Sequence, residues 1–229
     1  MALAAASSCG RVQTNPAESE AKRDAAMRVG ASGDASRAPE LLGLLDDRDE
    51  VVRATAAGEL GRLRARAATG ALLERLAKEK RVFVRKTIAY ALGEIGDPSA
   101  VPPLTERLGR ERDKEARAAL VTALGQLGDR AAVPALVGRL SDREAFVRRE
   151  AARALGLVGD PSAVPDLVAR LRGDSEADVR RHAAEALGRL GDERARKPLS
   201  AAVHDPDPYV ADTAVAALAA LRPEGGRDE

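Results

Sequence analysis

Two histidines, His182 and His204, are the residues of this chain best suited to proton transfer or metal binding. An imidazole titrates near neutral pH, so His182 could act as a general base. Each stands alone, however, and the sequence contains no HExxH, GxSxG, P-loop or GxGxxG motif around which a site could form. We interpret His182 as a surface residue and His204 as part of an exposed loop. The chain is therefore predicted not to be an enzyme and to hold no cofactor or metal.

A second set of reactive side chains pairs a carboxylate with an arginine six residues later. The pairs are Asp47 and Arg53, Glu79 and Arg85, Glu111 and Arg117, Asp142 and Arg148, and Asp174 and Arg180. Such an array could be a charged track for a ligand, or a ladder of ion pairs that ties each inter-helix turn to its neighbour. A last copy keeps Asp205 but has Ala211 in place of the arginine. The ladder is favoured, because the arginine disappears where no further repeat follows.

The aromatic residues form a third set, made of two phenylalanines and two tyrosines. Phe83, Phe146 and Tyr209 each directly precede a recurring segment, and Tyr90 lies within one such segment. None of them replaces a leucine or valine of the recurring apolar pattern, so they occupy positions that vary between repeats. Aromatic residues and arginine are enriched at binding hot spots. The alternative is that each aromatic ring only covers the adjacent turn.

These sets are spaced by an internal repeat of about 31–32 residues, a length typical of solenoid proteins. One signature begins with Gly-Asp and is found at 96–102, 128–134, 159–165 and 191–192. The other, typified by Val147 to Gly156, recurs at 52–61, 84–93, 116–125 and 179–188, with degenerate copies at 21–30 and 210–219. We predict six full repeats after an N-terminal half-repeat.

Each repeat is predicted to contain two helices, because its apolar residues recur at helical spacing. Three serines are expected to be N-caps of first helices, four prolines to lie in their first turns, and four glycines to be left-handed C-caps of second helices. The serines are Ser36, Ser99 and Ser162; the prolines are Pro39, Pro102, Pro134 and Pro165; the glycines are Gly96, Gly128, Gly159 and Gly191. Inner glycines should let neighbouring helices approach closely; they are Gly93, Gly125, Gly156 and Gly188. Pro223 is expected to end the last helix.

A single hairpin of this kind cannot bury its apolar face alone, so the hairpins must stack. The predicted fold is an all-α, gently curved, right-handed α-solenoid of stacked two-helix repeats, with the second helices on the concave side. The aromatic residues and their basic neighbours then face a concave groove. A protein or peptide partner is predicted to bind there. The predicted partner-binding residues are Phe83, Lys86, Tyr90, Phe146, Arg149, Arg153, Arg181, His182 and Tyr209.

Charge and composition narrow the class of partner. Lys+Arg is 37 and Asp+Glu is 36, whereas proteins whose main partner is nucleic acid or an anionic membrane usually have a basic excess. Carboxylates share the concave positions: Glu50, Glu94, Glu115, Glu150, Asp178, Glu185 and Asp212. Mixed sign favours a protein or peptide, and makes nucleic acid unlikely. The basic cluster Arg149, Arg153, Arg181 and Arg189 keeps nucleic acid as a minor alternative.

The type of apolar residue supports helices over sheets. Alanine, leucine and valine supply most of the 45% hydrophobic content, and tryptophan is absent. Small side chains of this kind suit close helix packing better than a β-sandwich or barrel. No apolar run reaches the length of a membrane span. The single cysteine, Cys9, excludes an intramolecular disulfide framework and a CxxC site.

The two signatures together resemble the short HEAT-like repeats named after phycobilisome bilin lyases, over about residues 21–222. The resemblance implies a HEAT-like α-solenoid. Proteins of this group look like scaffolds and adaptors, bilin lyase subunits and, with added metal ligands, a hydroxylase of modified lysine. The hydroxylase's His-Glu iron ligands have no counterpart here, so its di-iron site is not expected. A bilin-lyase-like accessory subunit, or another enzyme-associated HEAT protein, remains an alternative to the scaffold function.

The segment Leu3 to Gly10 resembles the end of a bacterial lipoprotein signal, in which small residues precede an acylated cysteine. The lack of a basic region before it and the short apolar stretch argue against this interpretation. We predict a cytoplasmic location. The alternative is an envelope lipoprotein, anchored through Cys9, if the true start lies upstream. The predicted division is an N-terminal segment 1–18, a repeat solenoid 19–222 and a disordered tail 223–229.

Overall fold

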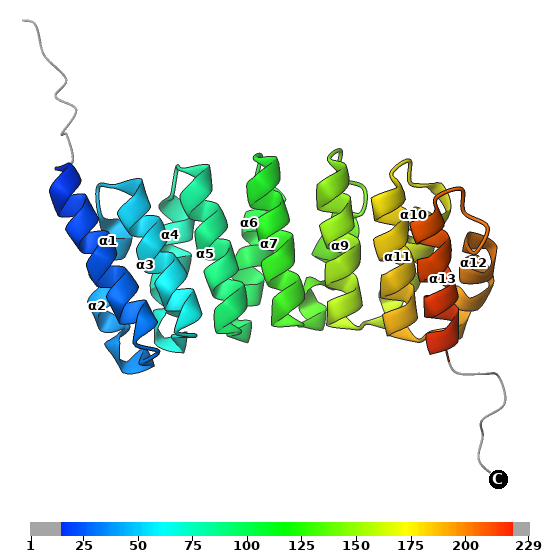
Figure 1. The fold of residues 1–229 in the computed structure, drawn as a ribbon, viewed down its shortest axis with the longest axis horizontal. Helices are drawn as coiled ribbons and strands as arrows, with labels where there is room; N and C mark the ends of the chain where they lie inside the picture. The colour runs from blue at the N-terminus through cyan, green and yellow to red at the C-terminus, as the bar shows by residue number, and fades with distance from the viewer. Residues whose placement is uncertain (1–14, 222–229) are drawn as a thin grey trace, which may run out of the picture.

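The computed structural model describes residues 15–221 as a single curved row of helices (Figure 1). The half-repeat is α1 (Pro16–Ala31). The hairpins are α2 (Pro39–Leu42) with α3 (Glu50–Arg62), α4 (Thr69–Lys78) with α5 (Val82–Ile95), α6 (Val101–Arg110) with α7 (Lys114–Leu127), α8 (Val133–Arg139) with α9 (Ala145–Val158), α10 (Val164–Gly173) with α11 (Ala177–Leu190), and α12 (Arg196–Ala202) with α13 (Pro208–Ala220). The all-α fold of six repeats after a half-repeat is confirmed.

First helices begin differently from the prediction. A 3₁₀ turn precedes the first helix of each hairpin. In five of these six turns an aspartate is the cap and accepts the backbone N–H two residues later, whereas the turn before α4 has Ala65 at that position. Three of these contacts are Asp34 with Ser36 N (2.9 Å), Asp97 with Ser99 N (3.0 Å) and Asp160 with Ser162 N (2.8 Å). The three serines predicted as N-caps are therefore donors to the cap, and that prediction was wrong. A carboxylate placed directly after the C-cap glycine reaches the free N–H first.

The predicted positions of proline and glycine are confirmed. The four prolines lie in the first turns of α2, α6, α8 and α10. The four C-cap glycines have φ between +63° and +74°, a left-handed conformation that a side chain disfavours. After α3 the same position holds Arg64, whose φ of +48° makes it the non-glycine exception within residues 15–221.

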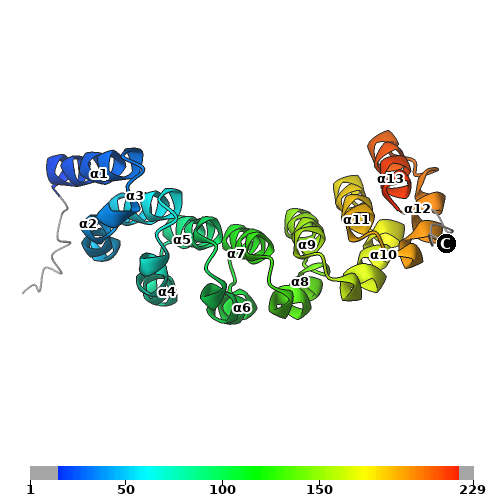
Figure 2. The same ribbon diagram turned by 90° about the horizontal axis from the view of Figure 1, so that it is seen from below.

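The solenoid bends because second helices approach one another more closely than first helices do. A Cβ atom added to Gly125 would lie 2.7 Å from the Cβ and 2.8 Å from the Cα of Ala154, so the two backbones almost touch. A similar glycine–alanine contact joins Gly156 to Ala186 and Gly188 to Ala217. Second helices pack along their length against their neighbours, whereas first helices contact one another weakly. The second helices therefore line the concave side, as predicted (Figure 2).

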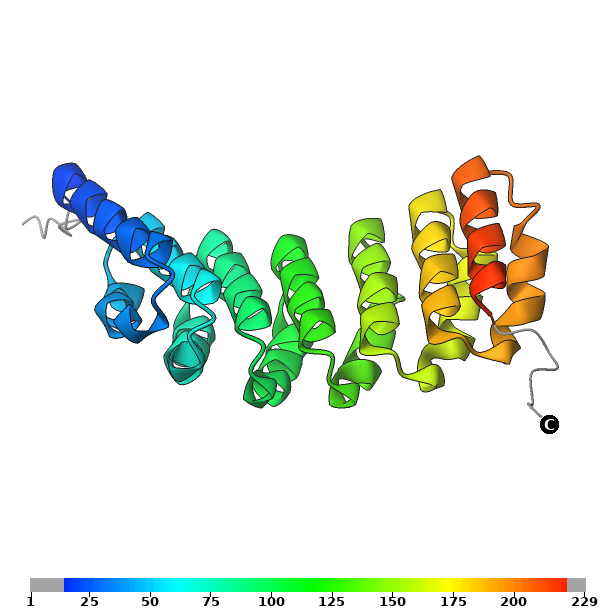
Figure 3. The same ribbon diagram turned by 60° about the horizontal axis from the view of Figure 1, so that its bottom comes forward.

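The chain follows a right-handed path from hairpin to hairpin, with the second helices α3, α5, α7, α9, α11 and α13 side by side on one face (Figure 1, Figure 3). The hydrophobic core is a continuous strip of leucine, alanine and valine between the two layers of helices. None of the helices in residues 15–221 is long and apolar enough to cross a membrane. The structure starts α1 at Pro16, within the predicted N-terminal segment. Cys9, Pro223 and the predicted tail lie outside the described residues.

Candidate partner-binding face

The ladder arginines make two kinds of contact, one within their own repeat and one to the next. Arg117, for example, donates from Nη1 to the carbonyl oxygen of Arg112 in its own inter-helix turn (2.7 Å). Its Nε and Nη2 donate to the two carboxylate oxygens of Asp142 in the following repeat (2.8 and 2.9 Å). The five equivalent pairs are Arg53 with Glu79, Arg85 with Glu111, Arg117 with Asp142, Arg148 with Asp174, and Arg180 with Asp205. The ladder interpretation is confirmed.

The ladder carboxylates have little capacity left for a ligand. The Asp142 side chain is 4% exposed, and its Oδ1 also accepts the N–H of Glu144 (3.0 Å). Burial opposes ionisation of Asp142, but the hydrogen bonds from Arg117 and Glu144 N–H outweigh it and lower the pKa of the carboxyl. The ladder therefore joins repeats and does not form a ligand track.

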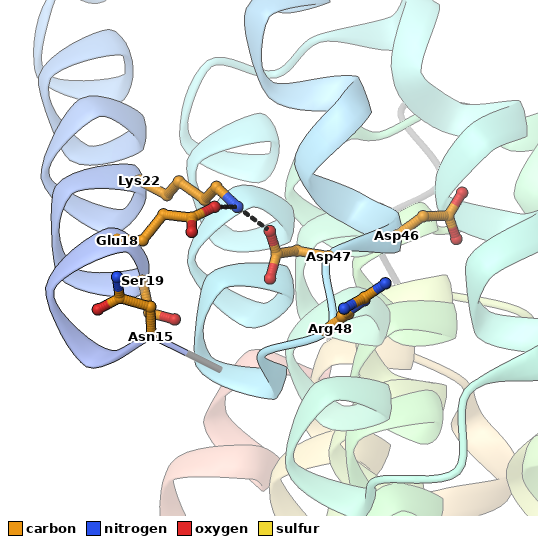
Figure 4. A pocket seen from close by; sticks show the side chains of 7 residues that line it. All are labelled: Asn15, Glu18, Ser19, Lys22, Asp46, Asp47 and Arg48. Carbon is orange, nitrogen blue, oxygen red and sulfur yellow. Dashed lines mark hydrogen bonds and ion pairs between the residues drawn. The ribbon is translucent and has the colours of Figure 1, made fainter. Parts of the chain in front are cut away.

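The first rung of the ladder differs from the others. Lys22 of α1 stands where later repeats have arginine, and its Nζ lies 2.9 Å from Asp47 and 2.6 Å from Glu18 (Figure 4). These residues border a hollow of about 330 Å³ beside the N-terminal half-repeat. Lysine lacks the planar fork of arginine, so it contacts the carboxylate without a bidentate pair. This hollow lies where the ladder ends, at its first rung, and we do not consider it a separate binding site.

A hollow of about 340 Å³ lies on the concave side above α7. Its floor is low because α7 places Ala118 and Thr122 there, where α5 and α9 carry longer side chains at equivalent positions. One wall comes from α5 and the other from α9. The lining residues are Lys86, Tyr90, Glu115, Ala118, Thr122, Phe146, Arg149, Glu150 and Arg153. We call this site the α7 hollow.

The charged groups of the α7 hollow are arranged around Glu150. Its side chain is 17% exposed and accepts from Arg149 Nη2 (3.0 Å) and from Arg153 Nε (2.9 Å). Burial opposes ionisation of Glu150, but the two guanidinium groups outweigh it and hold its pKa below the usual value. On the opposite side, Lys86 Nζ lies 2.5 Å from Glu115. The hollow is lined by ionised groups of both signs, with the arginines more exposed than the carboxylate between them.

The two aromatic rings of the α7 hollow differ in exposure. Tyr90 is 41% exposed, whereas Phe146 is half-buried. The Nζ of Lys114 lies 5.9 Å from the centroid of the Phe146 ring, within range of a cation–π contact. The rings and the charged groups together can hold a ligand by stacking, apolar contact and ion pairing. Among residues 15–221, no group of three His, Cys, Asp or Glu side chains could hold a metal ion.

The structure brings together five of the nine predicted binding residues: Lys86, Tyr90, Phe146, Arg149 and Arg153. Phe83 is 55% exposed and lies outside the hollow. Arg181 and Tyr209 line a different hollow beside α11 and α13. The Nδ1 of His182 lies 2.7 Å from the carbonyl oxygen of Asp178, so the imidazole ring is hydrogen-bonded to the backbone of its own helix.

Sequence reasoning missed Ala118 and Thr122, because it searched for residues that attract a ligand and not for residues that leave room. The signal was present in the repeats. At the position of Lys86 and Arg149, the intervening repeat has alanine, and at the position of Tyr90 and Arg153 it has threonine. Comparing equivalent positions would have located the hollow over α7.

The chain matches one protein family by sequence and many solved structures by fold. HEAT repeats match residues 38–121, 107–179 and 164–228. The complex of CpcE and CpcF of phycocyanin lyase from Nostoc sp. PCC7120 aligns at 23% identity and TM-score 0.55, covering 97% of this chain and 100% of that chain. A designed armadillo repeat protein in complex with the peptide (KR)4 aligns at 18% identity and TM-score 0.62, covering 80% and 99%. No curated protein matches the chain. At these identities the structural matches show the fold alone.

Proposed function

The chain belongs to the HEAT repeat family, and from that premise we propose that it is a non-catalytic scaffold whose concave groove binds a protein or peptide. The single observation that carries this proposal is the α7 hollow. It is the place where two aromatic rings and three cationic side chains from different repeats surround a depression in an otherwise regular surface. A preformed surface of this kind loses little conformational entropy when a partner docks.

The fold is compatible with this use. The designed armadillo repeat protein of similar fold holds a (KR)4 peptide. In this chain, the aromatic and arginine residues are of the types enriched at hot spots, and alternating signs along the groove suit the mixed chemistry of a polypeptide. A regular array of second helices also provides a long surface on which several partner residues can bind at once.

The experiment is a pull-down from a lysate of the source organism, comparing the wild type with a Tyr90/Phe146 double-alanine variant. We expect specific partners to be lost from the variant while its helical circular dichroism and unfolding transition remain those of the wild type. A matched control is Phe83→Ala, which removes an exposed aromatic residue outside the hollow. A partner retained equally by all three proteins would show that binding occurs elsewhere.

For a partner identified in this way, Phe146→Ala is expected to weaken binding by about 2 kcal/mol, a typical hot-spot effect. The free energy of unfolding should change by less than about 1 kcal/mol, because the ring is only half-buried. Isothermal titration calorimetry and urea unfolding measure the two quantities. A variant that loses stability but keeps its affinity would show that the ring serves the fold.

A bilin-lyase-like accessory subunit is the second candidate, favoured by the fold shared with the CpcE–CpcF complex. A co-purifying bilin, or a partner that carries one, would be visible in the absorption spectrum and would support this alternative over a general adaptor. A nucleic acid recovered instead, and released steeply with salt, would favour the basic cluster of α9 and α11 as the binding site.

A further inference from the structure

Arg153 is held in place by its neighbours but has unused hydrogen-bonding capacity. Its Nε donates to Glu150 Oε2 (2.9 Å), and Arg149 holds the other oxygen of the same carboxylate. Thr122 places its hydroxyl 3.4 Å from Glu150 Oε2. Glu150 is 17% exposed, so the group that orients Arg153 is itself mostly covered. Within residues 15–221, Nε is the Arg153 nitrogen that donates a hydrogen bond, and Nη1 and Nη2 donate none.

The surroundings of Arg153 define what could pair with it. A guanidinium group whose two terminal nitrogens are free is suited to a bidentate contact with a planar oxyanion. The hollow beside it has an alanine and a threonine on its floor and Tyr90 on the facing wall. A carboxylate that approaches Arg153 therefore brings the atoms attached to it against an aromatic and apolar lining.

The charge of the hollow favours an anion. Three cationic groups, Lys86, Arg149 and Arg153, face two carboxylates, Glu115 and Glu150, which leaves a net charge of +1 among the lining residues. Lys114, beside the Phe146 ring, pairs with Glu144 (3.7 Å), so these two residues leave the net charge at the edge unchanged. Because Glu150 is covered by the two arginines, its charge is less accessible to an incoming group than theirs.

We propose, building on the proposed function, that the α7 hollow binds an acidic side chain of an extended partner segment. Its carboxylate accepts hydrogen bonds from Nη1 and Nη2 of Arg153. An aliphatic or aromatic residue adjacent to it in the segment lies between Tyr90 and Phe146. The charge of the groove outside the hollow favours a polypeptide over a phosphate backbone as the ligand, because carboxylates interrupt the row of positive charges. Beyond α9, these carboxylates are Asp178 and Glu185 of α11.

The test uses random linear peptides displayed on phage and selected on the full chain. Selected peptides should share an Asp or Glu next to an aliphatic or aromatic residue. For one such peptide, fluorescence anisotropy gives the dissociation constant in a double-mutant cycle between Arg153→Gln and replacement of the peptide's acid by its amide. Each single change is expected to weaken binding about tenfold, and the double change no more than about tenfold, because both remove the same charged contact.

The control is Arg189→Gln, which removes a cation of α11 that pairs with Glu185 (2.7 Å) and lies outside the hollow. It should show no coupling to the peptide's acid.

Selection of neutral or basic peptides, or independent effects in the cycle, would overturn the acidic-segment inference. Loss of binding in Tyr90/Phe146 variants would still leave the proposed function standing. Peptides whose binding depends on neither ring, or a selection that yields no binder, would contradict both. Binding of a single-stranded oligonucleotide that displaces the peptide would overturn the inference in favour of a nucleic-acid ligand.

Discussion

Two sets of arginines run along this solenoid and have opposite characters. The ladder arginines recur at the same position in five successive repeats, and each forms a buried or nearly buried bidentate pair with the next repeat. The concave arginines, Arg149, Arg153 and Arg181, stand at positions that hold other residue types in other repeats. They are 35–39% exposed and pair with residues of their own helix. Periodic charge here joins repeats, whereas irregular charge distinguishes one part of the surface from another.

The largest expected effect is on the ladder. Arg117→Ala would leave Asp142 buried without its bidentate partner, because the remaining cation nearby, Arg139, is 3.8 Å away. We expect a loss of about 3 to 5 kcal/mol in the free energy of unfolding. Urea unfolding followed by circular dichroism measures it. A loss below about 1 kcal/mol would mean that the ladder is no more than a set of surface ion pairs.

Acid should weaken the same ladder. Burial opposes ionisation of Glu79, but hydrogen bonds from Arg53, the N–H of Arg81 and Arg75 outweigh it and lower its pKa from 4.5 to about 2. A depressed carboxyl pKa stabilises the folded state above the unfolded pKa, and this contribution is lost as pH falls toward the folded pKa. Glu79 alone then contributes on the order of 3 kcal/mol at neutral pH.

The corresponding measurement is the midpoint of urea unfolding as a function of pH. We expect it to fall progressively between about pH 4.5 and pH 2. A Glu79→Gln variant should be less stable than the wild type at pH 7 and should lose less stability over that interval. Parallel curves for the two proteins would contradict a depressed pKa at this residue.

Glycines also differ between the two layers: those at contacts between second helices have no room for a side chain, whereas a glycine of a first helix can have open space beside it. Gly125→Ala would place a Cβ atom 2.7 Å from Ala154, so we expect a loss of about 1 to 3 kcal/mol from overpacking. Gly109→Ala, in α6 of the outer layer, meets nothing within 4 Å and should be neutral or stabilise by up to about 1 kcal/mol. Thermal unfolding of the two variants tests the contrast, and equal effects would show that the second helices have room to adjust.

The smallest expected effect concerns a concave arginine. Arg181 pairs with Asp178 on the surface, with side chains 39% and 61% exposed. Arg181→Ala should therefore change the free energy of unfolding by less than about 0.5 kcal/mol. A loss comparable to that of Arg117→Ala would remove the distinction between the two sets of arginines.

The candidate site was harder to predict than the fold. The types of its residues were visible in the sequence, and five of the nine predicted residues line the α7 hollow. The other four lie elsewhere, because residues at concave positions of different repeats come together only where an intervening helix has small side chains. The serine caps failed for a more local reason, since the preceding aspartates reach the same N–H groups.

The sequence by itself determined the repeat length, the number of hairpins, the positions of prolines and C-cap glycines, and the side of the stack that each helix occupies. These features depend on local backbone preferences and on a period that recurs along the chain. Only the tertiary structure decided that each ladder arginine pairs with the following repeat, and that Glu150 orients Arg153 above a floor formed by α7. These contacts depend on the separation and curvature of neighbouring helices, which result from backbone packing at glycine–alanine contacts and not from any one segment.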